Sequence, residues 1–442
     1  MRDTATEDRP ARVAVPKQAG DTQEHWSWVE RAVWTDRMLT ALETGVKGGK
    51  WFSLMDKVYA SKSLHAAWET VRSKRGAGGV DGQSVHHFGA RAETELTRLE
   101  EQLRSNTYTP EPVRRVRIPK PGSPEGRPLG IPAVRDRVVQ TALRNALEPI
   151  FEHRFAPTSY GFRPQRGCKG ALRRVQALLD HGYTWVVDAD IERYFDTIPH
   201  EPLLTEVEKE VADGQVLTLL RAYLNAGIME GTKSWTSDTG TPQGAVISPL
   251  LANIYLHPVD VAMIEAGHEM VRYADDMVVL CRTEAEAHTA LERLRGLMTA
   301  RGLSVHPVKT RIVDATQPGG FDFLGYHFER GYRWPRKKSL GKLKDAIRAK
   351  TKRANGHSLT AIIDSVNRTL RGWFEYFKHS HAGTFTPIDG WVRMRLRSIL
   401  RKRQGRRGRG RGRDHQRWPN AYFRGKGLYS MHEAHVALCR SQ

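Results

Sequence analysis

The sequence predicts an α+β fold that continues into an all-helical C-terminal region. Short alternating runs that favour strands lie between helical patterns up to about residue 336. Beyond that point the strand patterns stop, and helical patterns fill residues 339–403. The chain has 442 residues, 39% of them hydrophobic, which is enough for a substantial core and for two or three domains.

The N-terminal part is expected to be helical after a disordered lead. Residues 1–26 have mixed charge and no apolar run typical of a signal peptide. Residues 27–70 carry aromatic and apolar positions at three- and four-residue steps, which predicts helices. A glycine-rich turn at 76–82 precedes a further helix at 88–104.

The next segment is predicted to contain a strand, a loop and a helix. PVRRVRI at 112–118 alternates as a strand does. The turn-rich run PKPGSPEGRP at 119–128 places Lys120 and Arg127 in a loop. Residues 134–155 read as a helix.

The middle of the chain alternates strands with helices. TWVVDADI at 184–191 is β-rich, and VRYADDMVVL at 271–280 predicts a hairpin. A Gly/Pro turn feeds an apolar helix over 241–256, and residues 284–302 form an amphipathic helical pattern. FDFLGYHFE at 321–329 predicts a short pair of aromatic strands.

Charge points to a polyanionic partner. The chain has 70 Lys and Arg against 49 Asp and Glu, a net charge of +21. A phosphate backbone is the usual partner of such a chain, and a solubility device or a ribosome-associated protein is the alternative.

Cysteine usage and hydropathy exclude several other classes. The three cysteines are widely spaced and form no C-x-x-C pair, which argues against a disulfide framework or zinc knuckles and fits a reducing cytosol. No run approaches the roughly 20 apolar residues that a membrane span needs.

Paired carboxylates mark the candidate site. Asp275 and Asp276 lie between the two apolar runs of the predicted hairpin. In the strand at 184–191, Asp188 and Asp190 point to one face because alternate residues share a face. We expect Asp275 and Asp276 to be buried together, because a divalent cation offsets the repulsion between buried carboxylates. The alternatives are a solvent-exposed acidic turn and, for Asp188, the favoured reading of a solvated edge position.

Several motifs in a fixed order resemble one family. DADIERYFDTI, TPQGAVISPLLANIYL, YADD, HPVKTRIV and FDFLGY are similar to the palm motifs of reverse transcriptases. RRVRIPKPGSPEGRPLGIPAVRDRVVQ and VNRTLRGWFEYFKHS resemble the fingers and the thumb of group II intron-encoded reverse transcriptase/maturases. The resemblance runs from about residue 50 to the C-terminus and is closest to the bacterial, endonuclease-lacking class. It implies a right-hand polymerase, with fingers and palm followed by an all-α thumb/maturase region.

The resemblance implies a two-metal catalytic centre. Asp190, Asp275 and Asp276 would be its catalytic, metal-binding aspartates, with Ile191 also among the metal ligands and two Mg²⁺ ions bound, Mn²⁺ being an alternative. Lys309 would lie near the site as a proton donor to pyrophosphate. A surface lysine in a strand turn is the alternative for Lys309.

The same resemblance implies residues that bind the nucleotide. Lys120 and Arg127 would hold the triphosphate, where basic side chains offset the charge that develops in phosphoryl transfer. Phe195 would exclude the ribose 2′-hydroxyl. Gln243 and Gly244 would pack against the nascent base pair or the incoming nucleotide.

Function, partners and domains follow as expectations. The protein would copy intron RNA into cDNA during retrohoming and would bind that RNA to assist splicing. Its partners would be group II intron RNA, an RNA template with a DNA primer, dNTPs and target DNA, in a bacterial cytoplasm and without a membrane. The alternatives are a splicing factor without polymerase activity and a domesticated relative used in defence, diversification or repair. The oligomeric state stays open.

The expected domains are an N-terminal lead at 1–26, a helical extension with the start of the fingers at 27–110, fingers and palm at 111–335, and a thumb/maturase region at 336–442. Within the last, the Gly/Arg-rich segment 404–414 is expected to be flexible. The aromatic residues that precede it would fill a core or stack on bases.

Overall fold

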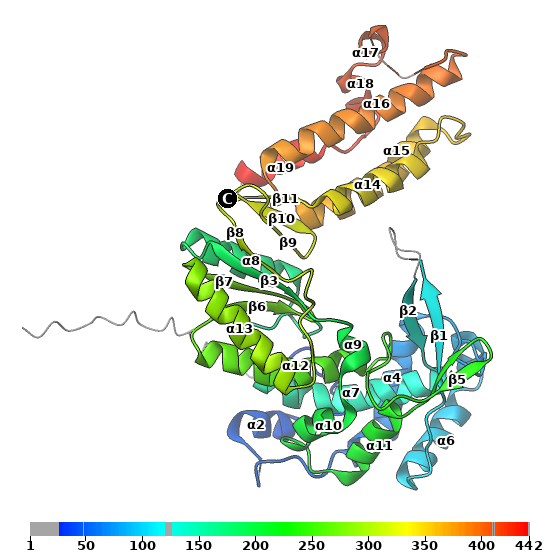
Figure 1. The fold of residues 1–442 in the computed structure, drawn as a ribbon. Coiled ribbons are helices and arrows are strands. Elements are labelled where there is room, and N and C mark those ends of the chain that lie inside the picture. The colour runs from blue at the N-terminus through cyan, green and yellow to red at the C-terminus, as the bar shows by residue number, and fades with distance from the viewer. Residues whose placement is uncertain (1–25, 47, 120–125, 409, 411, 441–442) are drawn as a thin grey trace, which may run out of the picture. The chain divides into compact units, whose positions relative to one another are not determined.

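The structure is a computed structural model that describes residues 26–46, 48–119, 126–408, 410 and 412–440 (Figure 1). It confirms the predicted α+β class. The chain forms two compact units, and each unit is built from separate stretches of sequence. The first unit comprises Met1–Phe155, Arg163–Gln165 and Ile198–Tyr255, and the second comprises Ala156–Phe162, Arg166–Thr197 and Leu256–Gln442. The lead expected at 1–26 lies outside the described residues except for Trp26.

The first unit packs helices around one central helix, α7 (Val134–Arg154). Thirteen residues of α7 are buried, on all sides of the helix, because it contacts neighbours all round rather than facing solvent along one stripe. The other helices are α2 (Asp36–Thr44), α3 (Met55–Tyr59), α4 (Ser61–Lys74), α5 (Val85–Gly89), α6 (Ala92–Arg104), α10 (His200–Glu208) and α11 (Gly214–Leu224).

A four-stranded sheet completes the first unit, in the order β2-β1-β4-β5. Strand β1 (Val113–Ile118) pairs antiparallel with β2 (Arg127–Ile131), and β1 pairs parallel with β4 (Ile228–Glu230). Strand β5 (Lys233–Trp235) closes a hairpin with β4. The β4–β5 hairpin was not predicted, because three residues are too few to show an alternating pattern.

The central sheet of the second unit has the order β6-β7-β3-β8. Its strands are β3 (Trp185–Asp190), β6 (Glu269–Tyr273), β7 (Asp276–Cys281) and β8 (Arg311–Asp314). One face, which includes Val186 and Val278, shares a hydrophobic cluster with helix α8 (Cys168–Asp180). Helix α13 (Glu284–Ala300) contacts β3, β7 and β8. Helix α12 (Ser248–Glu265) runs from the first unit into the second.

Because β3 lies between β7 and β8, the edge position favoured for Asp188 is wrong. Strand β8 supplies the missing neighbour, and its four residues gave no strand signal in the sequence. The short helix α9 (Tyr194–Thr197) follows β3.

A second, three-stranded sheet leads into the C-terminal helices. It has the order β11-β10-β9, formed by β9 (Phe321–Phe323), β10 (Tyr326–Glu329) and β11 (Tyr332–Pro335). The first two strands are the predicted aromatic pair, and β11 was missed. As predicted, no strand of the described residues follows position 336.

The C-terminal helices enclose a core of their own. They are α14 (Lys337–Lys350), α15 (Leu359–Phe377), the 3₁₀ turn η1 (Ala382–Thr384), α16 (Phe385–Arg403), α17 (Arg413–Arg417), α18 (Asn420–Gly425) and α19 (Met431–Arg440). We define the C-terminal core as the buried cluster that includes Ile363 and Phe374 from α15 and Leu396 from α16. Trp418, Phe423 and Met431, near the end of the chain, belong to the same cluster.

The described part of the Gly/Arg-rich segment contacts α16. The Arg401 Nε donates to the carbonyl oxygen of Arg407 at 2.7 Å, and the Gly410 amide donates to the Ser398 hydroxyl at 3.2 Å. The Arg401 guanidinium also pairs with Asp414 at 2.6 Å, where α17 has begun. Flexibility of residues 404–414 stays a prediction.

Over the ranges that the structure describes, no helix has both the length and the apolar character needed to cross a membrane.

Candidate active site on the central sheet

Three of the predicted aspartates meet at one end of the central sheet. The hairpin of β6 and β7 is confirmed, and only Ala274 and Asp275 connect its strands, since Tyr273 pairs with Asp276. Asp276 also pairs with Asp190, the last residue of β3. Two strands and one tight turn therefore bring Asp190, Asp275 and Asp276 together.

The electrostatics of this end reflect crowded negative charge. Burial of the carboxyl group, followed by the charges of Asp275, Asp188 and Asp190, raises the pKa of Asp276 to about 6. The residue as a whole is nevertheless exposed, and Asp190 and Asp275 are half-buried. The expectation that Asp275 and Asp276 are buried together is therefore wrong for Asp276. A site that must admit a large substrate has to stay open to solvent.

A lysine balances part of this charge. The Lys309 Nζ donates to the Asp190 Oδ2 at 2.5 Å. The loop that carries Lys309 is tied to the end of β3, because the His306 amide donates to the Asp190 carbonyl oxygen at 2.8 Å. Ile191, next in the chain, has a buried side chain and forms a bridge with Val305. Its side chain has no ligand atom, so only its carbonyl oxygen could contact an ion.

Asp188 has a cationic neighbour that sequence reasoning missed. The Arg311 Nε donates to the Asp188 Oδ2 at 3.3 Å. Burial raises the pKa of Asp188, and the charge of Arg311 opposes that rise. Arg311 is the first residue of β8, which pairs with β3, so recognition of β8 as a strand beside β3 would have placed Arg311 opposite Asp188.

A buried ion pair between Arg272 of β6 and Asp260 of α12 stabilises the hairpin. Arg272 donates to both carboxylate oxygens of Asp260, at 2.7 and 2.5 Å. The Arg272 Nη1 donates to the carbonyl oxygen of Ala274 at 3.0 Å. Ala274 has a φ of +58°, an unfavourable conformation for a residue with a Cβ. Arg272 therefore stabilises the strained turn directly before Asp275.

The donor chemistry of this end fits a hard divalent cation. Carboxylate oxygens are the ligands that Mg²⁺ prefers, and the burial and neighbouring carboxylates that raise the pKa of Asp276 would be offset by a bound cation. Among the described residues, no group of three or more His, Cys, Asp and Glu side chains is arranged so that it could hold an ion as it stands. Ion binding would require the carboxylates to close in and Asp190 to share its Lys309 contact.

Comparison with known proteins decides the family. Residues 118–328 match the family described as "Reverse transcriptase (RNA-dependent DNA polymerase)", and residues 340–418 match "Group II intron, maturase-specific domain". Protein YkfC of Escherichia coli K12 is 36% identical over 291 residues, which are 57% of this chain and 76% of that protein. The chain belongs to the group II intron reverse transcriptase/maturase family.

Other relatives match over shorter stretches. The group II intron-encoded protein LtrA of Lactococcus lactis subsp. cremoris is 34% identical over 232 residues, 52% of this chain but only 38% of LtrA. A solved structure titled "Partial Cas6-RT-Cas1--Cas2 complex" matches with a TM-score of 0.36 and 22% identity, over 56% of this chain and 42% of that one.

The nucleotide-binding residues predicted for this reverse transcriptase are divided between the units. Phe195 lies in α9 of the second unit, with the aspartates and Lys309. Arg127, Gln243 and Gly244 belong to the first unit, and Arg127 is exposed at the start of β2. Lys120 lies outside the described residues.

The Gln243–Gly244 turn of this reverse transcriptase is tightly fitted to strand β2. The Gly130 amide donates to the Gln243 carbonyl oxygen at 2.6 Å. Gly244 has a φ of +110°, and a Cβ there would lie 2.5 Å from the Gly130 carbonyl oxygen. Glycine is therefore required at position 244 by both the backbone conformation and the space.

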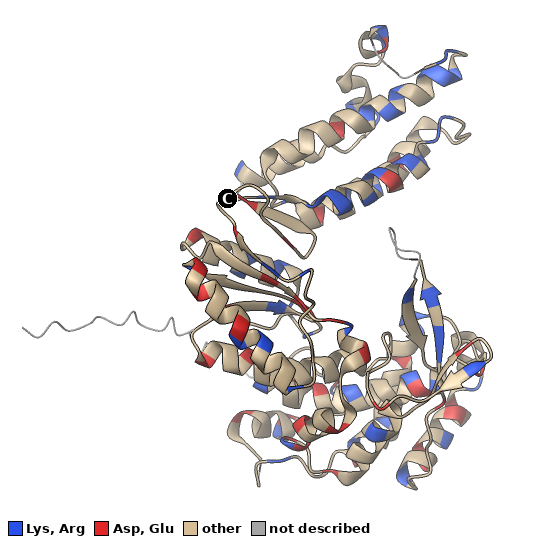
Figure 2. Ribbon diagram, viewed as in Figure 1, with Lys and Arg blue, Asp and Glu red and all other residues tan. Residues whose placement is uncertain are grey.

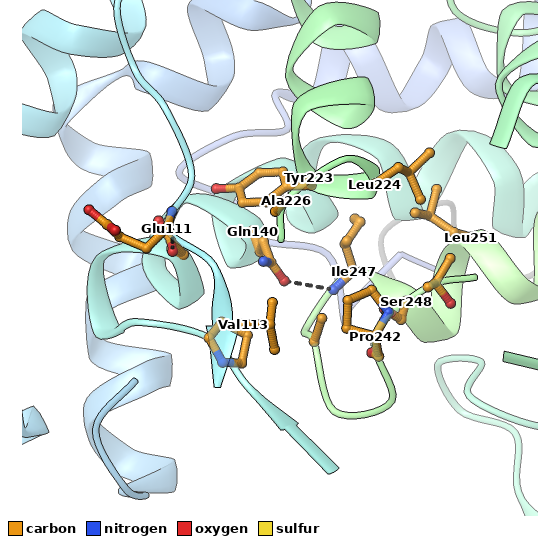
Figure 3. Close-up of a pocket in the computed structure, with 14 residues that line it drawn as sticks. Glu111, Val113, Gln140, Tyr223, Leu224, Ala226, Pro242, Ile247, Ser248 and Leu251 are labelled. Atoms are coloured by element: carbon orange, nitrogen blue, oxygen red, sulfur yellow. Dashed lines mark hydrogen bonds between the residues drawn. The ribbon is translucent and has the colours of Figure 1, made fainter. Parts of the chain in front are cut away.

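A pocket in the first unit shows how the backbone that follows the turn is held by α7 (Figure 3). The Gln140 Oε1 accepts from the amides of Val246 and Ile247, at 2.8 and 3.4 Å. Asp136, one helical turn earlier, also lines the pocket. The Tyr108 hydroxyl donates to the Asp136 Oδ1 at 2.5 Å. Sequence reasoning missed Asp136 and Gln140, although their i, i+4 spacing places them on one face of α7.

Acidification should stabilise the protein through Asp136. Burial raises its pKa to about 6, so the ionised group destabilises the folded state above that pH. As pH falls from about 7 to about 4, the folded state takes up a proton before the unfolded state does. We expect the free energy of unfolding to rise relative to Asp136→Asn by up to about 3 kcal/mol. Urea unfolding of both proteins across this range measures the difference, and a constant difference would contradict it.

Proposed function

We propose that this protein copies group II intron RNA into cDNA during retrohoming and binds the same RNA to assist splicing. Its reverse transcriptase and maturase-specific domains support both activities. The observation that carries the polymerase assignment is the meeting of Asp190, Asp275 and Asp276 at one end of the central sheet. Erosion of these carboxylates would be expected in a splicing factor that had lost polymerase activity.

The three aspartates would hold two Mg²⁺ ions, or Mn²⁺ in their place, with the Ile191 carbonyl oxygen as a further ligand. Bound ions would lower the pKa of the primer 3′-hydroxyl and neutralise the triphosphate. The carboxylates would orient the reacting groups from a fixed backbone, since the two-residue turn and the pairing with β3 hold the main chain while the side chains of Asp275 and Asp276 close on the ions.

The remaining predicted residues would bind and select the nucleotide. The Lys309 Nζ lies 2.5 Å from the Asp190 Oδ2, and Lys309 would donate a proton to the departing pyrophosphate. Phe195 would exclude the ribose 2′-hydroxyl. Lys120 and Arg127 would hold the triphosphate, and the Gln243–Gly244 turn would pack against the base pair or the incoming nucleotide.

The C-terminal helices would bind RNA. Figure 2 shows Lys and Arg distributed along α14 and α16. The buried residues of α14 are Leu343 and Ile347, and the helix also carries Lys338, Lys342 and Lys344, which are exposed or half-buried. Exposed cations on a helix attract phosphates, and their contribution falls with salt. We place the maturase interface on these helices.

The proposed domains keep the sequence order: lead 1–26, extension 27–110, fingers and palm 111–335, and thumb 336–442 with its segment 404–414. The protein would act in the bacterial cytoplasm, bound to intron RNA, with a primed RNA template, dNTPs and target DNA as its other partners.

Primer extension on an RNA template, with Mg²⁺ and dNTPs, tests the proposed polymerase. We expect cDNA that requires both the template and the ion. A parallel assay follows splicing of a group II intron with and without the protein. If the protein accelerates splicing but makes no cDNA under a broad range of conditions, it is a splicing factor and the polymerase assignment is overturned.

A further inference from the structure

Phe162 has a backbone conformation that its own side chain opposes. Its φ is +57°, and it is the one aromatic residue among the described non-glycine residues with positive φ. This region is unfavourable for a bulky residue because the Cβ approaches the following carbonyl oxygen. Burial does not compensate for the strain, since 47% of the residue is exposed. Strain that packing leaves uncompensated is typical of functional sites.

The neighbouring backbone explains how the strain persists. The Tyr160 amide donates to the Arg272 carbonyl oxygen at 2.8 Å, which ties the segment to strand β6. Gly161 fits so closely against the hairpin that a Cβ there would lie 2.3 Å from the Ala274 amide nitrogen. The chain is therefore fixed on the site just before Phe162, and positive φ determines where the Phe162 ring points.

That ring lies between the predicted sugar gate and the hairpin. Its centroid is 6.5 Å from the ring of Phe195, which it meets edge-on, and 6.4 Å from the ring of Tyr273. The edge-to-face contact with Phe195 has a favourable geometry at this distance, and the ring of Tyr273 is tilted by 44°. Phe162 thus connects α9 with the strand residue directly before the Ala274–Asp275 turn.

Phe195 needs support from outside its own helix. Helix α9 is a single turn of four residues, too short to hold its shape alone. Phe195 is only half-buried, and its ring contacts are those with Tyr194 and Phe162 among the described aromatic pairs. A ring that excludes a hydroxyl group by contact must stay in one rotamer, because a mobile ring moves aside for the larger sugar.

We propose that Phe162 is a positioning residue that holds the Phe195 ring in place and thereby sets the selection of deoxyribonucleotides over ribonucleotides. This inference rests on the proposed role of Phe195. Phe162 acts through Phe195 and is assigned no contact with the reacting atoms.

Phe162→Gly separates this role from a structural one. Glycine accepts positive φ, so we expect stability equal to or above that of the wild type. Without the ring, we expect the ratio of kcat/KM for dNTP to that for rNTP to fall about tenfold, as for other small steric discriminations. The loss should lie in faster rNTP incorporation, with dNTP incorporation changed by no more than a few-fold. Phe162→Tyr, which keeps the ring, should keep the ratio.

Two controls make the result decisive. Arg330→Gly relieves a similar strain, at φ +51°, in the exposed turn between β10 and β11, and should leave the ratio unchanged. Phe162→Leu provides a second loss of the ring should the glycine variant fold poorly. An unchanged ratio in both Phe162→Gly and Phe162→Leu overturns the inference.

Phe195→Ala separates the proposed role of Phe195 as the sugar gate from the proposed role of Phe162 in positioning it. If Phe195→Ala lowers the ratio and the Phe162 variants do not, only the role of Phe162 fails. If Phe195→Ala leaves the ratio unchanged, the proposed gate fails and the inference fails with it. If both residues act as one unit, Phe162→Gly should add no further loss of selectivity to Phe195→Ala.

Discussion

Replacing Asp275 or Asp276 by alanine should abolish most cDNA synthesis while leaving the affinity for intron RNA unchanged. Each carboxylate is expected to support several kcal/mol of transition-state stabilisation, so we expect a loss of at least about 10³-fold in extension rate. RNA affinity should persist because the proposed interface lies on α14 and α16. Single-turnover primer extension and a filter-binding titration, made on the same protein preparations, measure the two quantities.

An acidic residue on the helix that packs against this sheet serves as a matched control for the two alanine variants. Glu292 is exposed on α13, which packs on the central sheet, and forms a local ion pair with Arg295 three residues on. Glu292→Ala should lose less than a few-fold of the extension rate. Extension by Asp275→Ala or Asp276→Ala at the level of Glu292→Ala would show that the paired carboxylates do not carry the reaction.

Breaking the buried ion pair beneath the hairpin should have the largest effect on stability. Arg272 and Asp260 expose 1% and 0% of their side chains, so removing one partner leaves the other charge buried and uncompensated. We expect Arg272→Met or Asp260→Leu to lower the free energy of unfolding by about 3–5 kcal/mol. The double variant should lose less than the sum of the two, since no lone charge remains. Urea unfolding of the four proteins measures the cycle.

An exposed pair on the same strand gives the reference. Glu269 of β6 pairs with Arg174 of α8 at 2.5 Å, with 32% and 44% of these side chains exposed. Its disruption by Glu269→Gln should cost no more than about 1 kcal/mol. A similar small loss for Arg272→Met would contradict the supporting role given to the buried pair.

Strands and helices that are long enough to show a repeating pattern of apolar residues could be predicted from the sequence. Strand β3 and the hairpin each show five or six residues of alternation or apolar run, bounded by turn residues. The long helices α7, α13, α15 and α16 show several turns of periodicity. Strands β4, β5, β8 and β11 have only three or four residues and, unlike the equally short β9 and β10 in FDFLGYHFE, were not marked by a shared run of aromatic residues, so their pairing partners decide their conformation.

The carboxylates of the site could be predicted because their motifs are local in sequence. Their surroundings could not, since these depend on contacts between separate elements. The pairing of Arg272 with Asp260 joins a strand to a helix, and the salt bridge between Lys309 and Asp190 joins residues 119 positions apart. The central position of Asp188 follows from the strand order, and Asp276 is exposed as the first residue of β7; the sequence pattern contains neither.

The C-terminal core contains residues from both sides of the Gly/Arg-rich segment. Trp418, Phe423 and Met431 follow that segment in the chain yet pack with Ile363 and Leu396, which precede it. The run of glycines and arginines is thus an internal loop of one folded body. A chain truncated within this segment would lose three of the buried side chains of the C-terminal core, Trp418, Phe423 and Met431. A chain cut once within it would keep them, and the two fragments would stay associated through the same core.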